Sequence, residues 1–187
     1  MKKLFMILPL VLILFFMVGC RDKEAMAELE KLKAQAEVEE QNKEIMRRVF
    51  EVLDNGVNKE DFESIFEMVD EIFSDEYICH FATSKIHGPK EYKERLRLYP
   101  TIFEDMKHII EDNFAKGNMV VTRCTFRAIL KGNFMGIPPT GNQITYPVLY
   151  IHCIEDGKIK EAWIDYDSLF NLAMQLGMEL VPKEGKK

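Results

Sequence analysis

Glycine and proline are scarce in this chain, with 10 and 7 among 187 residues, which excludes a collagen-like or low-complexity protein. The four cysteines are too few for a fold built on disulfides. The 25 Lys and Arg residues are outnumbered by 31 Asp and Glu residues, so there is no basic excess to bind nucleic acid, and no nucleic-acid partner is expected. Because 47% of the residues are hydrophobic, the chain can bury a core, and its length suits one domain with an appendage.

The chain's long apolar run follows Lys2 and Lys3 and covers residues 4–18. These 15 residues would rise about 22 Å as a helix, less than the ~30 Å hydrocarbon core of a bilayer. Such a run is typical of a secretory signal peptide, which is expected over residues 1–19. The end of the run, Val18-Gly19-Cys20, resembles a bacterial lipobox, so lipidation is expected at Cys20. An uncleaved anchor and a plain signal peptide are the alternatives.

A lipid at this cysteine would hold the protein at the bacterial cell envelope, in the inner or the outer membrane. The acidic body has no attraction for anionic lipids, so the lipid itself is expected to make the membrane contact. Residues 20–40 are rich in Glu, Lys, Ala and Gln with ion pairs at helical spacing, which predicts a charged helical spacer. The globular domain is expected over residues 41–180, and a disordered tail over 181–187.

Within the domain, hydrophobic periodicity predicts helices first and strands afterwards. A helix over 41–54 is expected to end at Asn55-Gly56, and Asn58 is expected to cap the next helix. A strand is predicted at 76–81, and Gly88-Pro89 opens a third helix. The remaining predicted elements are strands over 106–114, 118–131, 143–154 and 158–166 and a last helix over 167–177. This order indicates an α+β fold, with helices on one face of a curved sheet.

Short motifs along these elements resemble those of a known family. They are Phe134–Gly141 (FMGIPPTG), Glu155–Ile159 (EDGKI), Glu161–Trp163 (EAW) and Gln175–Gly177 (QLG). In combination they resemble the SnoaL-like polyketide cyclase (ester cyclase) family. The resemblance implies the cone-shaped α+β barrel of the nuclear-transport-factor-two-like superfamily. That barrel has a strongly bent antiparallel sheet, helices on its concave face and a pocket at its open end, and no cofactor is implied.

The chemistry implied by the resemblance is an intramolecular aldol ring closure, in which an aspartate acts as acid/base on a small, largely apolar molecule in the pocket. This chain has other residue types at the family's four catalytic polar positions. These four positions are Cys79, Val148, Tyr150 and Ile164. Together with Tyr77 and Arg127 they make up the expected pocket. Tyr77 matches a family tyrosine, and Arg127 could meet a carboxylate or enolate. Two functions stay open, a cyclase or isomerase with displaced acid/base residues and a non-catalytic ligand-binding envelope lipoprotein.

Asp165 is the first candidate for a displaced acid/base residue. It directly follows one of the family positions, and one step along a strand turns a side chain to the opposite face. The turn at 155–157 is predicted to be a three-residue hairpin loop, which pairs Tyr150 with Ala162. That register places Asp165 outside the pocket unless a bulge changes it.

His80 and His152 are the other candidates, because imidazole exchanges protons near neutral pH. His80 lies at the end of the first predicted strand, and His152 shares the parity of Tyr150. A structural role for either histidine is the alternative. No two histidines have the spacing of metal ligands, so no metal is expected.

The outer face of the sheet is predicted to be apolar. By parity, it contains Leu149, Ile151, Cys153 and Trp163. An apolar face that no helix covers favours contact with a partner, so a homodimer through this face is expected.

Overall fold

The computed structural model describes residues 4–81, 84–134 and 136–165, with side chains from residue 23 to residue 164 within these ranges. Two compact units divide the chain, Met1–Val38 and Glu39–Lys187, and helix α1 (Leu4–Lys59) contributes to both. Residues 23–37 of this helix are exposed, as expected of a charged spacer. Over the described residues, no helix has both the length and the apolar character needed to cross a bilayer. The side chain of Cys20, the predicted helix 167–177 and the predicted tail lie outside the described residues.

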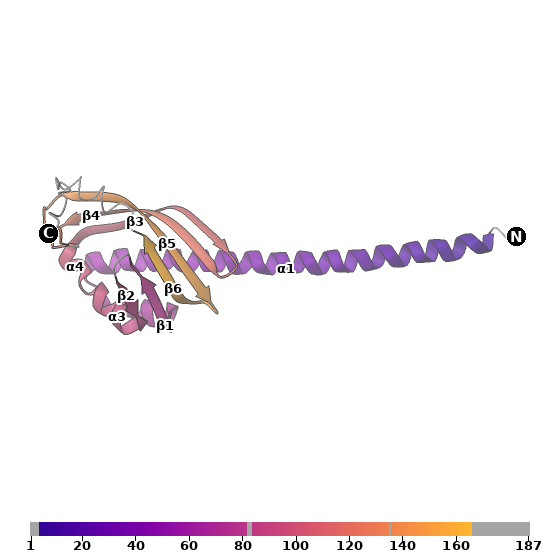
Figure 1. Cartoon of the computed structure of the whole chain (residues 1–187), viewed down its shortest axis with the longest axis horizontal. Coiled ribbons are helices and arrows are strands. Elements are labelled where there is room, and N and C mark those ends of the chain that lie inside the picture. The colour runs from indigo at the N-terminus through magenta and orange to yellow at the C-terminus, as the bar shows by residue number, and fades with distance from the viewer. Residues whose placement is uncertain (1–3, 82–83, 135, 166–187) are drawn as a thin grey trace, which may run out of the picture. The chain divides into compact units, whose positions relative to one another are not determined.

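The second unit has an α+β fold, as predicted, built on a curved six-stranded sheet of order β2-β1-β6-β5-β4-β3 that does not close (Figure 1). The last four strands form an antiparallel meander, in keeping with the antiparallel sheet that the resemblance implies, whereas β1 and β6 pair in parallel. The remaining elements are α2 (Phe62–Ile72), β1 (Phe73–His80), β2 (Lys85–His87), α3 (Gly88–Leu96), α4 (Tyr99–Ile102), β3 (Phe103–Lys116), β4 (Met119–Leu130), β5 (Gln143–Glu155) and β6 (Lys158–Asp165).

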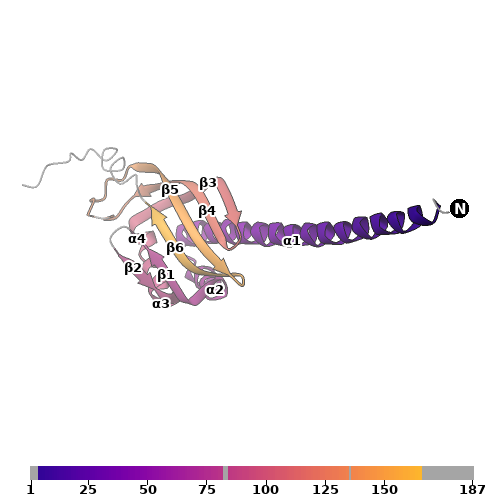
Figure 2. The same ribbon diagram turned by 45° about the vertical axis from the view of Figure 1, so that its right-hand side comes forward.

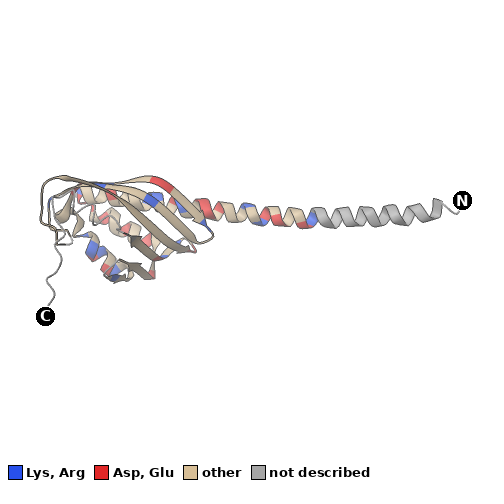
Figure 3. Ribbon diagram, turned by 45° about the horizontal axis from the view of Figure 1, so that its top comes forward, with Lys and Arg blue, Asp and Glu red and all other residues tan. Residues whose placement is uncertain are grey.

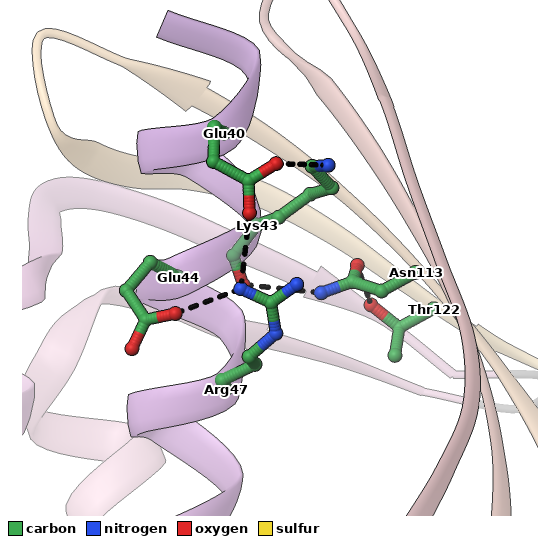
Figure 4. Close-up of polar contacts among 6 residues, drawn as sticks. All are labelled: Glu40, Lys43, Glu44, Arg47, Asn113 and Thr122. Carbon is green, nitrogen blue, oxygen red and sulfur yellow. Dashed lines mark hydrogen bonds and ion pairs between the residues drawn. The ribbon is translucent and has the colours of Figure 1, made fainter. Parts of the chain in front are cut away.

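The domain part of α1 lies along the concave face of the sheet (Figure 2). Its Asn42 amide donates to the Gly117 carbonyl at 3.2 Å, and the Asn113 amide donates to the Lys43 carbonyl at 3.1 Å. Asn113 also accepts a hydrogen bond from the Thr122 hydroxyl at 3.1 Å, as Figure 4 shows beside the ion pairs on the outer surface of the helix. These bonds join the helix to β3 and to the β3–β4 turn. Apolar side chains of both layers form the core between them.

The first domain helix does not end at Asn55-Gly56, contrary to the sequence prediction. Gly56 is buried in α1, and a Cβ there would lie 2.5 Å from the Ile65 Cγ1 atom. The glycine therefore allows close packing against α2 rather than a helix stop. The helix ends at Lys59, and Glu60 follows with a left-handed φ of 56°. Asp61 caps α2 by accepting from the Ser64 backbone N–H at 3.2 Å, so the prediction that Asn58 is the cap is wrong.

Asn58 instead holds a bulge in β3. Its Nδ2 donates to the Met106 carbonyl and its Oδ1 accepts from the Met106 N–H, both at 2.8 Å. The register of β3 against β4 shifts at this point, and Asp105 has a left-handed φ of 51°. A bulge leaves backbone groups outside the ladder, and buried groups of that kind need another partner. The Asn58 side chain provides that partner.

The β5–β6 hairpin is tighter than predicted. Its loop is the two residues Asp156 and Gly157, both with positive φ, as a type I′ turn requires. The register of β5 against β6 also shifts between Ile154 and Cys153, so Tyr150 pairs with Ile164 and not with Ala162. The turn and this irregularity each shift the register by one residue. Since the shifts add to two, the faces of the strands stay as predicted.

The outer face of the sheet contains the apolar residues predicted for it. Leu149 is exposed, and Ile151, Cys153 and Trp163 are half-buried. Ile151 pairs directly with Trp163. The homodimer through this face stays a prediction.

We expect Asn58→Ala to lower the free energy of unfolding by roughly 1–3 kcal/mol, because it leaves two buried backbone groups of Met106 without partners. Asn55→Ala is the matched control, since Asn55 is exposed on the same helix. It should change stability by less than about 0.5 kcal/mol. Urea unfolding of both variants measures the difference, and equal stability of the two would contradict this role of Asn58.

Candidate functional site

A cavity of about 30 Å³ lies between α1 and the concave face of the sheet. That is about the volume of one water in the liquid, whereas small-molecule sites usually enclose about 300–1,000 Å³. Aromatic side chains fill most of the space expected for a ligand, so a molecule of several carbon atoms enters only when some of them move. The cavity is lined by Met46, Val49, Phe50, Leu53, Phe73, Tyr77, Tyr92, Tyr99, His108, Tyr150, His152 and Ile164.

Three polar side chains form a hydrogen-bonded chain that reaches this cavity. The Asp54 Oδ1 atom lies 2.6 Å from Nδ1 of His108, and Nε2 of His108 lies 2.9 Å from the Tyr150 hydroxyl. The side chains of His108 and Asp54 are only 6% and 16% exposed, so water screens these contacts weakly. The helix α1 supplies Asp54, the edge strand β3 supplies His108, and β5 supplies Tyr150.

The backbone of β3 fixes the position of His108. Asp54 uses its second carboxylate oxygen to accept from the His108 backbone N–H at 2.7 Å, so one side chain holds both the strand and the ring. Phe50 packs on the imidazole with ring centroids 4.9 Å apart, and Phe126 packs on it at 5.1 Å. The ring is therefore held in place by two hydrogen bonds and two aromatic contacts.

For a neutral imidazole beside a carboxylate, the chain of hydrogen bonds has one consistent proton arrangement. A carboxylate only accepts, so Nδ1 of His108 donates to Asp54. In a neutral imidazole the other nitrogen is then an acceptor, and Nε2 accepts from the Tyr150 O–H. The phenol of Tyr150 is thus connected to a base whose tautomer and orientation are set by a carboxylate. Such an arrangement can pass a proton between the cavity and His108.

His152 is a second buried imidazole at the cavity. It is 5% exposed, and its Nδ1 has no hydrogen-bond partner among the described residues. Its ring stacks on that of Tyr150, with centroids 6.1 Å apart. Burial lowers the pKa of His152 to about 3, so this imidazole is neutral at neutral pH. A neutral, unpartnered ring nitrogen can bond to an oxygen group of a ligand.

Four of the residues expected in the pocket are buried, and Ile164 is half-buried. Tyr77, Tyr150 and Ile164 line the cavity, whereas Cys79 and Val148 are buried in the core beside it. Burial raises the pKa of the Tyr77 hydroxyl well above its usual value and that of the Cys79 thiol to about 11. Both groups are therefore protonated at neutral pH. Ile164 pairs directly with Tyr150, as neighbours on adjacent strands.

Two of the other proposed residues, His80 and Arg127, do not line the cavity. His80 bonds through Nε2 to Glu161 at 2.6 Å and stacks on the Trp163 ring at a centroid distance of 5.2 Å. Arg127 is exposed and lines a separate hollow. Asp165 is placed by the backbone register opposite Leu149, and its side chain lies outside the described residues.

Asp54 and His108 were not identified by the sequence patterns. The one signal is parity, because His108 alternates with the buried Met106 along β3 and so shares its face. Asp54 directly follows Leu53 on the apolar face of α1. The two residues are 54 positions apart, and no local pattern connects them. Among the described residues, no three His, Cys, Asp or Glu side chains group closely enough to hold a metal ion.

Comparison with known protein families identifies the chain. The family model of the SnoaL-like polyketide cyclases matches residues 43–176. The chain belongs to the SnoaL-like polyketide cyclase family. No curated protein matches it.

Solved structures show the same fold as this SnoaL-like chain. A protein described as a SnoaL-like polyketide cyclase, from Jannaschia sp. CCS1, has a TM-score of 0.63 at 20% identity, over 72% of this chain and 91% of its own. TsrD from Streptomyces laurentii has a TM-score of 0.60 at 24% identity, over 72% and 96% of the two chains. IdmH from Streptomyces antibioticus, described as a polyketide cyclase, has a TM-score of 0.55 at 24% identity, over 71% and 98%.

We expect the stability of this SnoaL-like protein to fall as the pH is lowered from 6.5 towards 3, because His152 is neutral in the folded state and takes up a proton when unfolded. The stability that its low pKa provides is fully present above pH 6.5. Below that pH it decreases by about 1.4 kcal/mol per pH unit, or about 2 kcal/mol by pH 5.

The measurement is urea unfolding at pH 7 and pH 5. His152→Leu removes the titrating group, so its stability should change less between the two values by about that 2 kcal/mol. His87→Gln is the matched control, because His87 is exposed and its removal should leave the pH dependence as it is. An unchanged slope in His152→Leu would disprove the assignment.

Proposed function

We propose that this protein is an acid/base enzyme of the cyclase or isomerase type that acts on a small, largely apolar carbonyl compound. The observation that carries the proposal is the chain from Asp54 through His108 to the Tyr150 hydroxyl, which ends at the cavity. Membership of the SnoaL-like polyketide cyclase family supports the reaction class. The proposal assigns the proton-transfer role to residues outside the family's four catalytic positions, with the exception of Tyr150.

In this proposal Tyr150 is the group that meets the substrate. A proton leaves the carbon next to the carbonyl for the Tyr150 oxygen, while the phenol proton passes to Nε2 of His108. The imidazolium formed lies against the Asp54 carboxylate, which stabilises its charge. The reverse transfer returns a proton to carbon. His152 Nδ1, with no partner among the described residues, provides a bonding position for the substrate oxygen.

A second candidate function is ligand binding without catalysis. Its support comes from Ile164 and Val148, because aliphatic side chains, half-buried and buried respectively, stand where the family has a catalytic aspartate and a glutamine. In that case Tyr150, His108 and Asp54 form a buried structural network. The two candidates differ in whether proton transfer occurs.

We also propose that the protein is attached to the bacterial envelope by a lipid on Cys20. Its support is the apolar run over residues 4–18 followed by Gly19-Cys20. We expect Cys20→Ser to abolish incorporation of labelled palmitate and to release the protein from the membrane fraction in a bacterial host. Cys153→Ser is the control, and incorporation that persists in Cys20→Ser would contradict the proposal.

The test of acid/base chemistry is hydrogen exchange at carbon, which needs no knowledge of the natural substrate. In D₂O, the wild-type protein should accelerate deuterium uptake next to the carbonyl of small ketones such as cyclohexanone or 2-tetralone, followed by NMR. Tyr150→Phe and His108→Gln should each lose about 10²-fold or more of the acceleration, a usual contribution of general acid–base catalysis.

His80→Gln is the matched control, because it makes the same substitution at a histidine that bonds to Glu161 away from the cavity. It should keep the full rate. Absence of exchange above the buffer rate, together with a carried ligand in native mass spectrometry, would favour the non-catalytic function. Equal losses in His80→Gln and His108→Gln would contradict the assignment.

A further inference from the structure

A second and larger hollow, of about 340 Å³, opens at the bulge of β3. There Asp105 and Met106 together occupy the space opposite Ala128, because Glu104 pairs with Ile129 and the next pair is Lys107 with Arg127. The extra residue in β3 separates the two strands locally. The hollow is lined by Asn58, Asp105, Met106, Lys107, Arg127, Ala128, Ile129 and Gln143.

Two cations face each other at this hollow. Lys107 and Arg127 are direct cross-strand partners, both are exposed, and neither has an ion-pair partner among the described residues. Arg123 shows the contrast, since it lies four residues away on the same strand and its Nε donates to Asp112 at 2.7 Å. Charges of both signs are interspersed over the described domain, so this unpaired cation pair is a local feature (Figure 3).

Like charges directly opposite in a sheet destabilise it, and a bound anion would offset that repulsion. Arginine presents a planar fork of N–H donors and lysine a point charge, a combination that suits carboxylate and phosphate oxygens. Gln143, which also lines the hollow, has an amide that can donate as well. Asp105 is the acidic residue of the lining, so the group as a whole has a net charge of +1.

We infer that this hollow binds a small oxyanion, a carboxylate or phosphate group, between Arg127 and Lys107. The volume accommodates such a group, and the site is separate from the cavity that holds Tyr150 and His152. The inference does not depend on the proposed enzyme function, because none of the residues in the proton-transfer chain lines the hollow.

The experiment uses the full chain with inorganic phosphate and acetate as probes and sodium chloride at matched ionic strength as the reference. Calorimetric titration should show saturable binding of at least one of the two probes, and that probe should raise the melting temperature above the value in chloride. A response to phosphate alone identifies a phosphate site and a response to acetate alone a carboxylate site, and either supports the inference.

Arg127→Gln should weaken binding of that probe about tenfold or more, as expected when a charge-assisted hydrogen bond is lost. Lys107→Gln is a second variant that tests the same site if the first does not fold. Arg123→Gln is the matched control, because it removes the same charge from the same strand, and it should leave the affinity within about twofold. No saturable binding of either probe, or an equal loss in Arg123→Gln, would overturn the inference.

Discussion

The contact between α1 and the bulge of β3 is the interaction on which the geometry of the site depends. Asn58 bonds to the backbone of Met106, and one helical turn earlier Asp54 bonds to the backbone and the ring of His108. Positions i and i+4 of a helix lie on one face, so both side chains meet the same strand. Since β3 is the edge strand of the sheet, this contact replaces the neighbour that a further strand would provide.

The polar groups at the cavity are held by surroundings that are otherwise apolar. Phe50 packs on both His108 and Tyr150, with ring centroids 4.9 Å apart in each case. In such surroundings a hydrogen bond is stronger than in water, and an unpartnered polar group costs free energy. The side chains of Asp54, His108 and Tyr150 are hydrogen-bonded to one another. His152, in contrast, keeps one nitrogen without a partner among the described residues. The cavity therefore combines a fixed chain of hydrogen bonds with an open bonding position.

The strands and their faces were largely predictable from the sequence, because alternation along β3 to β6 reflects burial on one side. Gly56 shows where such prediction fails, since a glycine in a helix is read as a stop unless its packing partner, Ile65, is known. The β5–β6 register shows a different case. Two register shifts of one residue each added up to two, so the predicted faces were right although the predicted pairing of Tyr150 was not.

Sequence alone determined the fold class and the family, since these follow from local patterns and short motifs. The tertiary structure decided which polar groups meet. Asp54, His108 and Tyr150 lie on three elements far apart along the chain, and their contact depends on where a helix crosses a bulged strand. The cross-strand placement of Lys107 opposite Arg127 depends on the same bulge. No local pattern encodes it, because a bulge changes the register only through pairing with another strand.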